Sequence, residues 1–281
     1  MTSRIRSAAI LLASVATAVT ALAQPAAAAD PSPGGWTGGD HFHVDSLTGG
    51  EGLASAPDGS LLYRGLASVP LSLRDKGWNH IGDPDISDGG YVFDAYQSDG
   101  TTSKLFTVTT PDGQRYEYEH TLDSGEAHNN SFATVSPDNQ WLVSGEWGDE
   151  NRLQVFPAPL LNPSTPPTGG ALPQAGQISL DRTVNNVQGC DFVSGTRLVC
   201  VSDDATKDLL QVDLPHALDG SPVTGTVTTL LQLPQDSICS GDFEAEGVDY
   251  DPRSRTLRAE VVPPGICKAA TRVYEYSPTT G

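Results

Sequence analysis

Two stretches nearly two hundred residues apart share one pattern, and this pattern constrains the fold more than any other feature of the sequence. They are Glu51–Leu62 and Glu246–Leu257. Each begins with glutamate and glycine, continues as a short apolar run, turns at a proline and ends in a second apolar run. Such runs on either side of a proline-led turn are typical of a β-hairpin. Each stretch is therefore predicted to form a hairpin with a carboxylate at its start.

Weaker copies of this pattern recur along the chain, while no sustained 3.6-residue period appears after Trp36. A recurring supersecondary unit predicts an architecture in which each copy packs against its neighbours. Aligned on their turns, the predicted hairpins are Glu51–Leu62, Ile81–Phe93, Asn130–Val143, Gln188–Val201 and Glu246–Val261.

Further strands are predicted after most of these hairpins, and their number defines the fold class. Four antiparallel strands repeated around an axis form the blades of a β-propeller. The chain is therefore predicted to be all-β, a propeller of about five blades of four strands, with six blades as the alternative. A lone strand at His41–Leu47 would complete the last blade and close the ring. The third and fourth strands are predicted at 104–108, 152–156, 209–212 and 272–276, and at 115–122, 177–184 and 225–233.

The first 29 residues have the features of a Sec-type signal peptide. A basic start is followed by an apolar run from Ala8 to Ala23 and by alanine-rich sequence to Ala29. A membrane anchor is the alternative, but the apolar run is short for a span. We expect secretion, with residues 30–281 forming a single domain. The proline-rich segment Pro157–Pro173 is predicted to be a surface loop of that domain, with a domain linker as the alternative.

The charge balance restricts the partners of the protein. The chain has 16 basic and 35 acidic residues, and its formal net charge is −19. Such an acidic surface repels nucleic acid and anionic lipid and favours cations or basic partners. Solubility outside the cell is the alternative reason for the excess acid. We expect neither nucleic-acid binding nor membrane insertion, and a monomer whose ligand is an extracellular protein, glycan, cation or small molecule.

All four cysteines follow the predicted signal, which favours disulfide bonds in an oxidising compartment. Residues that face each other across a hairpin have a constant sum of residue numbers. The midpoint of Cys190 and Cys200 falls on the predicted turn at Gly195, and that of Cys239 and Cys267 falls in the turn at 251–254. We therefore predict the pairs Cys190–Cys200 and Cys239–Cys267. Zinc binding is the alternative, but no C-x-x-C spacing is present.

The start of the first strand and the end of the second strand of a hairpin lie at one face of the ring, so polar residues there should gather at one mouth of the central channel. Channel water is the alternative occupant. Carboxylate and amide oxygens are the ligands that Ca²⁺ prefers. The ligand-binding candidates at this mouth are Glu146, Trp147, Gln188, Asp203 and Glu244.

The glutamate–glycine motif before a proline-led turn resembles the inner strands of calcium-dependent propeller hydrolases of the regucalcin, gluconolactonase and phytase-like groups. The resemblance covers only the two hairpins at Glu51 and Glu246. It implies a Ca²⁺ site in which these two glutamates are ligands, with Asn130 or Asn186 as amide ligands. It also implies hydrolysis of a lactone, ester or phosphate as an activity.

A second resemblance involves His80-Ile-Gly-Asp-Pro-Asp-Ile, which is similar to a strand of five-bladed glycosidases that holds their catalytic base. This resemblance implies Asp83 as the base. A glycosidase needs a second, protonated carboxyl group, and Glu146 is the candidate in suitable chain order. His128 is a further candidate for acid–base chemistry, with an ordinary loop role as the alternative.

Two functional classes therefore remain open from the sequence. The first is a secreted binding protein that recognises its ligand through an acidic channel mouth, and this is the function we favour. The second is a Ca²⁺-dependent propeller hydrolase. No acid–base residue beside the metal ligands is identified by a motif, and so the sequence does not decide whether the protein is an enzyme.

Overall fold

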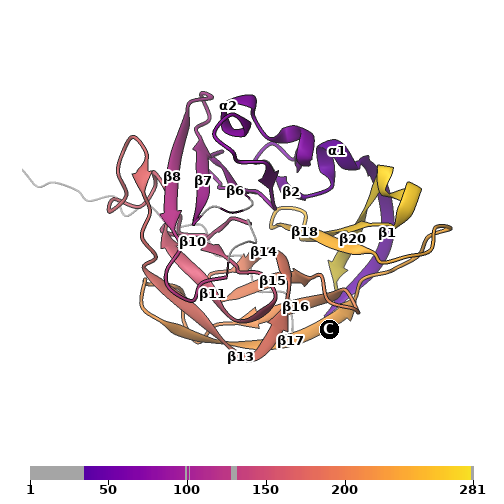
Figure 1. Ribbon diagram of the computed structural model, residues 1–281. Coiled ribbons are helices and arrows are strands. Elements are labelled where there is room, and N and C mark those ends of the chain that lie inside the picture. Colours follow the sequence, from indigo (N-terminus) through magenta and orange to yellow (C-terminus); the bar gives the residue numbers. More distant parts are fainter. Residues whose placement is uncertain (1–34, 99, 101, 128–131, 280–281) are drawn as a thin grey trace, which may run out of the picture.

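The computed structural model describes residues 35–98, 100, 102–127 and 132–279, so the predicted signal peptide lies outside the described residues. The described chain is mostly β-structure, arranged as hairpin-based units that follow one another around a common centre (Figure 1). We number these units I to V along the chain. Their first strands lie nearest the centre and carry the candidate site.

Unit I is a two-stranded hairpin and lacks the third and fourth strands of a complete blade, and no further strand was predicted directly after the hairpin Glu51–Leu62. Its strands β2 (Gly52–Ser55) and β3 (Leu61–Arg64) pair antiparallel. The chain then forms the 3₁₀ helix η1 (Leu66–Ser68) and the helix α2 (Leu71–Arg74), which begins after Pro70. Leu73 from α2 is fully buried against unit II, so this short helical segment occupies the space of the missing strands.

Unit II is a multistranded sheet whose outer edge is extended by a distant segment. The proline-rich segment at 157–173 contributes β12 (Gly170–Ala171), which pairs in parallel with β8. This segment is thus part of the domain rather than a linker. The other strands are β4 (His80–Ile81), β5 (Asp85–Ile86), β6 (Val92–Gln97), β7 (Ser103–Thr109) and β8 (Arg115–Thr121).

Units III and IV have four strands each, and their outermost strands β13 and β17 pair in parallel, which joins them into one eight-stranded sheet. This pairing was not predicted, because the repeat pattern specifies strands within a unit and carries no signal for pairing between units. Unit III contains β9 (Thr134–Val135), β10 (Trp141–Ser144), β11 (Asp149–Pro157) and β13 (Gly176–Asn185). Unit IV contains β14 (Val187–Ser194), β15 (Arg197–Ser202), β16 (Asp208–Asp213) and β17 (Val223–Gln232).

Unit V is completed by the N-terminal strand of the described chain. Strand β1 (Trp36–Asp45) pairs antiparallel with β20 (Ala270–Pro278), with His41 opposite Tyr274. Figure 1 shows β1 in indigo beside β20 in yellow, so the two ends of the domain meet in one sheet. The predicted N-terminal closure is confirmed. The other elements are α1 (Ser46–Gly49), β18 (Glu244–Asp251), β19 (Thr256–Val262) and the 3₁₀ helix η2 (Gly265–Ala269).

The hydrophobic core lies between successive units, and strand β15 shows why. Successive residues of a strand point to opposite faces of its sheet. Leu198 and Cys200 accordingly pack in the cluster shared with unit III, whereas Val199 and Val201 pack in the cluster shared with unit V. Each unit is therefore held by its neighbours on both faces.

Both predicted disulfides are present. Cys190 lies opposite Cys200 in the β14–β15 pair, with an S–S distance of 2.03 Å. The second bond joins Cys239, which precedes β18, to Cys267 in η2. No helix in the described part of the chain has the length and apolar character needed to span a bilayer.

Candidate functional site at the two ends of the central axis

Asp83 fills the centre of the molecule and connects the units. Its carboxylate accepts hydrogen bonds from the backbone N–H of Leu53 in unit I at 3.0 Å and of Val248 in unit V at 3.1 Å. Its backbone oxygen accepts one from Ala133, next to unit III. The side chain is 1% exposed, and burial raises the pKa of Asp83 well above its usual value.

Glycines surround this carboxylate because no larger residue fits there. A Cβ atom at Gly247 would lie 2.6 Å from Asp83 Oδ1, and one at Gly52 or Gly189 would lie closer still to Asp83. The glycine of the glutamate–glycine motif is thus required by close packing at the axis. Asp83 and these glycines divide the centre into two cavities, one at each end of the first strands.

The first cavity, which we call the acidic mouth, has a volume of about 270 Å³ and lies at the beginning of the first strands. Of the sequence-predicted candidates, it contains Glu51 and Glu246 together with Trp147, Gln188, Asp203 and Glu244. His80 and Gln97 complete the lining. Residues from the starts of three first strands, Glu51, Gln188 and Glu246, therefore share one cavity.

Three of the four acids in the acidic mouth have cationic or imidazole partners. Glu51 lies 3.1 Å from His80 Nε2, Asp203 lies 2.9 Å from Lys207 Nζ, and Glu244 lies 2.6 Å from Lys268 Nζ. For the Glu246 carboxylate, no hydrogen bond or ion pair is found within the described residues. Glu246 thus brings a carboxyl group without a compensating partner to the cavity.

The electrostatics of the acidic mouth reflect this excess of acid. Burial raises the pKa of Glu246 well above its usual value, and the nearby Glu51, Asp203 and Glu244 raise it further. Burial and Glu51 likewise raise the pKa of Glu260, a fully buried residue of β19. Neither carboxylate oxygen of Glu260 has a hydrogen-bond partner among the described residues. A cation at this mouth would relieve the repulsion among these groups.

The acidic mouth contains oxygen donors of the types that Ca²⁺ binds, although no three of its His, Asp and Glu side chains bring ligand atoms within 4.8 Å of one another among the described residues. Glu51 and Glu246 supply carboxylate oxygens, and the Gln188 amide lines the same cavity. The two asparagines suggested by the family resemblance are placed differently. The Asn186 side chain accepts a hydrogen bond from the backbone N–H of Gly148, and it does not line this cavity. Asn130 lies outside the described residues, as does His128.

Glu146 and Trp147 are adjacent in sequence but have different surroundings. Trp147 is 44% exposed and lines the acidic mouth. Glu146 is buried, accepts the backbone N–H of Ala127 at 2.8 Å and pairs with Arg152 Nε at 2.6 Å. Neither Glu146 nor Asp83 lines the acidic mouth, so this cavity does not bring together the acid and base that the glycosidase resemblance suggests.

The second cavity lies at the other end of the first strands, where the hairpin turns meet, and we call it the turn mouth. It has a volume of about 430 Å³ and includes Asp85, Asp191 and Asp249 in its lining. Sequence reasoning missed these aspartates. A signal was present, since Asp191 and Asp249 each stand two residues after an axial glycine, and Asp85 stands two residues after Asp83.

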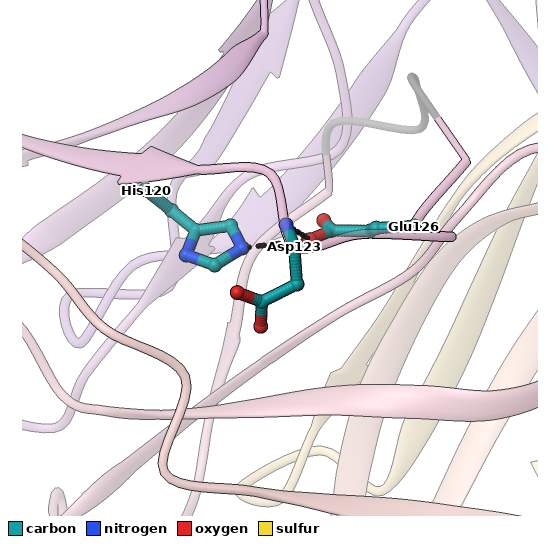
Figure 2. Close-up of side chains that lie close together, drawn as sticks. All are labelled: His120, Asp123 and Glu126. Carbon is teal, nitrogen blue, oxygen red and sulfur yellow. Dashed lines mark hydrogen bonds and ion pairs between the residues drawn. The ribbon is translucent and has the colours of Figure 1, made fainter.

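A third cluster, His120, Asp123 and Glu126, has ligand atoms within 4.8 Å of one another (Figure 2). His120 Nε2 lies 2.9 Å from Glu126 Oε2, and its Nδ1 faces the backbone oxygen of Leu172 at 3.1 Å. Both ring nitrogens of His120 therefore face oxygen atoms. Burial opposes the ionisation of Glu126, but hydrogen bonds from His120 and the Asp123 N–H lower its pKa to about 2.

Lys104 connects this cluster to the neighbouring unit. Its buried ammonium lies 3.5 Å from Glu126 Oε1 and also contacts the Gly145 backbone oxygen and the Gln154 side chain, both outside unit II. The Lys104 ammonium and the His120 ring therefore lie beside the two carboxylate oxygens of Glu126. The cluster offers a metal less uncompensated charge than the acidic mouth, and its contacts join unit II to unit III.

No protein-family model matches the sequence, and no curated protein matches it. The solved structures that resemble the fold do so distantly. A luciferin-regenerating enzyme aligns over 78% of this chain and 66% of its own with 10% identity and a TM-score of 0.44. The Cps50 (Swd1) β-propeller domain of Myceliophteria thermophila aligns over 77% and 58% with 13% identity and a TM-score of 0.38.

A chain of a mitotic checkpoint complex aligns over 93% of this chain and 99% of its own, with 10% identity and a TM-score of 0.40. These neighbours include an enzyme and a β-propeller domain of another kind, and none specifies a function for this chain. The function is therefore argued from the side chains of the mouths.

Proposed function

We propose that this protein is a secreted, monomeric five-bladed β-propeller that binds a cation, or the cationic group of an extracellular ligand, at the acidic mouth. The observation that carries the proposal is Glu246. Its carboxylate lines a cavity between Glu51, Asp203 and Glu244 without a described partner of its own. Burying a charge without compensation is costly, and a bound cation would supply the compensation.

Ca²⁺ is the cation that this donor set supports best. Glu51, Glu246 and Gln188 offer oxygen ligands in one cavity, and Asn130 or Asn186 would add an amide oxygen if the ligand set follows the family resemblance. Glu260 lies behind the mouth as a buried carboxylate without a described hydrogen bond. Trp147, on the rim, offers a flat surface for a larger ligand such as a glycan.

Calorimetric titration and thermal melting in Ca²⁺, each after chelator treatment, test the proposal. At a hundredfold excess of free Ca²⁺ over its Kd, binding should stabilise the protein by about 2.7 kcal/mol. The E51Q/E246Q variant should lose this shift. The matched control D40N/D75N removes the same charge from two exposed positions that line neither mouth, and it should keep the shift. An unchanged Ca²⁺ affinity in E51Q/E246Q would contradict the assignment.

Cation-dependent hydrolysis is the second candidate, and the position of His80 favours it. The imidazole lines the acidic mouth and lies 3.1 Å from Glu51. A bound Ca²⁺ supplies Lewis-acid polarisation of an acyl or phosphoryl oxygen. His80 would then accept the proton of an attacking water, with Glu51 holding the ring in place.

Assays with aryl esters, lactones and phosphate esters, with and without Ca²⁺, separate the two candidates. The hydrolase candidate requires Ca²⁺-dependent turnover that falls at least about a hundredfold in H80Q. Binding of Ca²⁺ without any turnover would leave the binding function alone. Glycan binding that survives chelator would instead indicate that the ligand contacts the mouth directly.

A further inference from the structure

The turn mouth is a partly open cavity that the proposed function does not use. It is formed where the hairpin turns of all five units converge, and each turn contributes to its wall: Pro57, Ser87, Pro137, Ser194 and Pro252. Its volume of about 430 Å³ lies within the range of small-molecule sites. The axial layer of Asp83 and the glycines separates this cavity from the acidic mouth.

Much of the wall of the turn mouth is apolar. Ile86, Val135, Phe192 and Tyr250 line it from four different units or their turns, and Val193 lies at the rim, half-buried. Such a surface favours the apolar body of an organic molecule over a fully hydrated ion.

The lining of the turn mouth includes three aspartates from three different first strands, together with Asp88, Asn139, Arg253 and several serines. Asp85 accepts the backbone N–H of Val135 at 2.6 Å, Asp191 that of Tyr250 at 2.6 Å, and Asp249 that of Ser55 at 2.7 Å. Each carboxylate thus bridges to the next unit around the ring. A carboxylate has about four lone-pair sites, so acceptor capacity remains after these bonds.

The charge of these aspartates is only partly balanced. Asp249 pairs with Arg258 at 2.9 Å, and Arg258 also pairs with Glu275. Arg253, on the rim, pairs with Asp251 at 2.9 Å. No ion pair to Asp85 or Asp191 is found within the described residues. Burial raises the pKa of both, and the charges of neighbouring aspartates raise it further.

We infer that the turn mouth binds a small organic cation, namely a protonated amine carried on an apolar or aromatic body. The ammonium group would donate to the free lone pairs of Asp85 and Asp191, and the body would lie against Phe192, Tyr250 and Val135. An inorganic cation fits less well, since Ca²⁺ takes six to eight oxygen ligands and each of these carboxylates already accepts backbone hydrogen bonds.

Tryptamine and its neutral isostere tryptophol are suitable probes, because they share a ring and a chain length and differ in the ammonium group. Calorimetry at pH 7.5 should show tryptamine binding at least about tenfold more tightly than tryptophol, as expected for charge-assisted hydrogen bonds. Equal affinities would overturn the inference, and so would a failure of tryptamine to bind.

Two variants locate the binding. S194F places a ring in the cavity from a half-buried turn position without touching the aspartates, and it should abolish tryptamine binding. D191N should reduce the tenfold preference for tryptamine to about twofold or less. Thermal melting confirms that both variants are folded. Tryptamine binding that is unchanged in folded S194F would contradict the site.

Ca²⁺ binding at the acidic mouth and tryptamine binding at the turn mouth can be lost independently of each other. E51Q/E246Q should lose Ca²⁺ binding and keep tryptamine binding, whereas S194F should lose tryptamine binding and keep Ca²⁺ binding. Loss of tryptamine binding in folded E51Q/E246Q would assign the amine to the acidic mouth and overturn the inference.

Discussion

The two ends of the central axis use the same first strands and the same residue type in different ways. Strand β18 carries Glu246 at the acidic mouth and Asp249 at the turn mouth, three residues and roughly 10 Å further along. Glu246 has no described partner, whereas Asp249 accepts the backbone N–H of Ser55 and pairs with Arg258. A carboxylate of the turn mouth therefore connects neighbouring units and keeps only its remaining lone pairs for a ligand, whereas the Glu246 carboxylate makes no such connection.

The largest loss of stability should come from removing the Asp83 carboxylate, which lies between the two mouths. In D83A the N–H groups of Leu53 and Val248 lose their acceptor, and each buried unpaired N–H costs about 1–3 kcal/mol. We expect a loss of roughly 2–6 kcal/mol or a failure to fold, measured by urea denaturation. D83N keeps one acceptor and should lose less. A D83A variant as stable as the wild type would show that Asp83 does not hold the units together.

The disulfide between Cys239 and Cys267 can distinguish the two mouths, because it lies near the acidic mouth only. It joins the segment before β18 to η2, close in sequence to Glu244 and Lys268. C239S/C267S should lose about 3 kcal/mol of stability and weaken Ca²⁺ binding at the acidic mouth. Tryptamine binding at the turn mouth should not change. Equal weakening at both mouths would show that the ends are not independent.

The pH dependence of stability follows from the buried acids. Burial raises the folded-state pKa of Asp85 to about 6 and that of Glu150 to about 8. Their contributions to stability are fully present below the unfolded pKa values near 4 and are lost as the pH rises through 6 and 8. Thermal melting should therefore show a lower Tm at pH 8 than at pH 5.

Glu126 acts in the opposite direction, because its folded-state pKa of about 2 gives a contribution that is lost as the pH falls below about 4. The stability maximum should thus lie near pH 4–5. E150Q should flatten the decline between pH 5 and 8, while the exposed control D40N should not. A Tm that rises steadily from pH 5 to 8 would contradict the raised pKa values.

The smallest expected effect concerns an exposed ion pair at the acidic mouth. Lys268 pairs with Glu244 at 2.6 Å and competes with an incoming cation. K268Q should change stability by less than about 1 kcal/mol and increase Ca²⁺ affinity a few-fold at low salt, measured by calorimetry. An affinity that falls in K268Q would show that Lys268 contributes to the site.

Much of the fold follows from local sequence. Glycine after Glu51 and Glu246, and the turn residues after each first strand, specify hairpins whose order along the chain is the order of units around the axis. The cysteine pairs were predictable because hairpin geometry fixes which residues face each other. The helical segment of η1 and α2 in unit I was not predicted, because it depends on burial of Leu73 against unit II, which is a tertiary effect.

The sequence predicted members of the candidate site only where the position of a residue along its strand determines which cavity it lines. Glu51, Gln188 and Glu246 stand at equivalent positions, and they meet in one cavity. His80 lines the same cavity, but no sequence motif predicted that it would lie beside Glu51. The aspartates of the turn mouth escaped prediction because their environment depends on the backbone of the neighbouring unit, which no local pattern describes.

Terbium luminescence tests the central claim most directly. Tb³⁺ replaces Ca²⁺ at oxygen-rich sites and emits when a nearby tryptophan is excited, and Trp147 lines the acidic mouth. The account predicts emission that Ca²⁺ competes away, that E51Q/E246Q abolishes and that W147F greatly reduces without loss of Ca²⁺ binding. Emission that is undiminished in both variants would place the cation elsewhere and contradict the account.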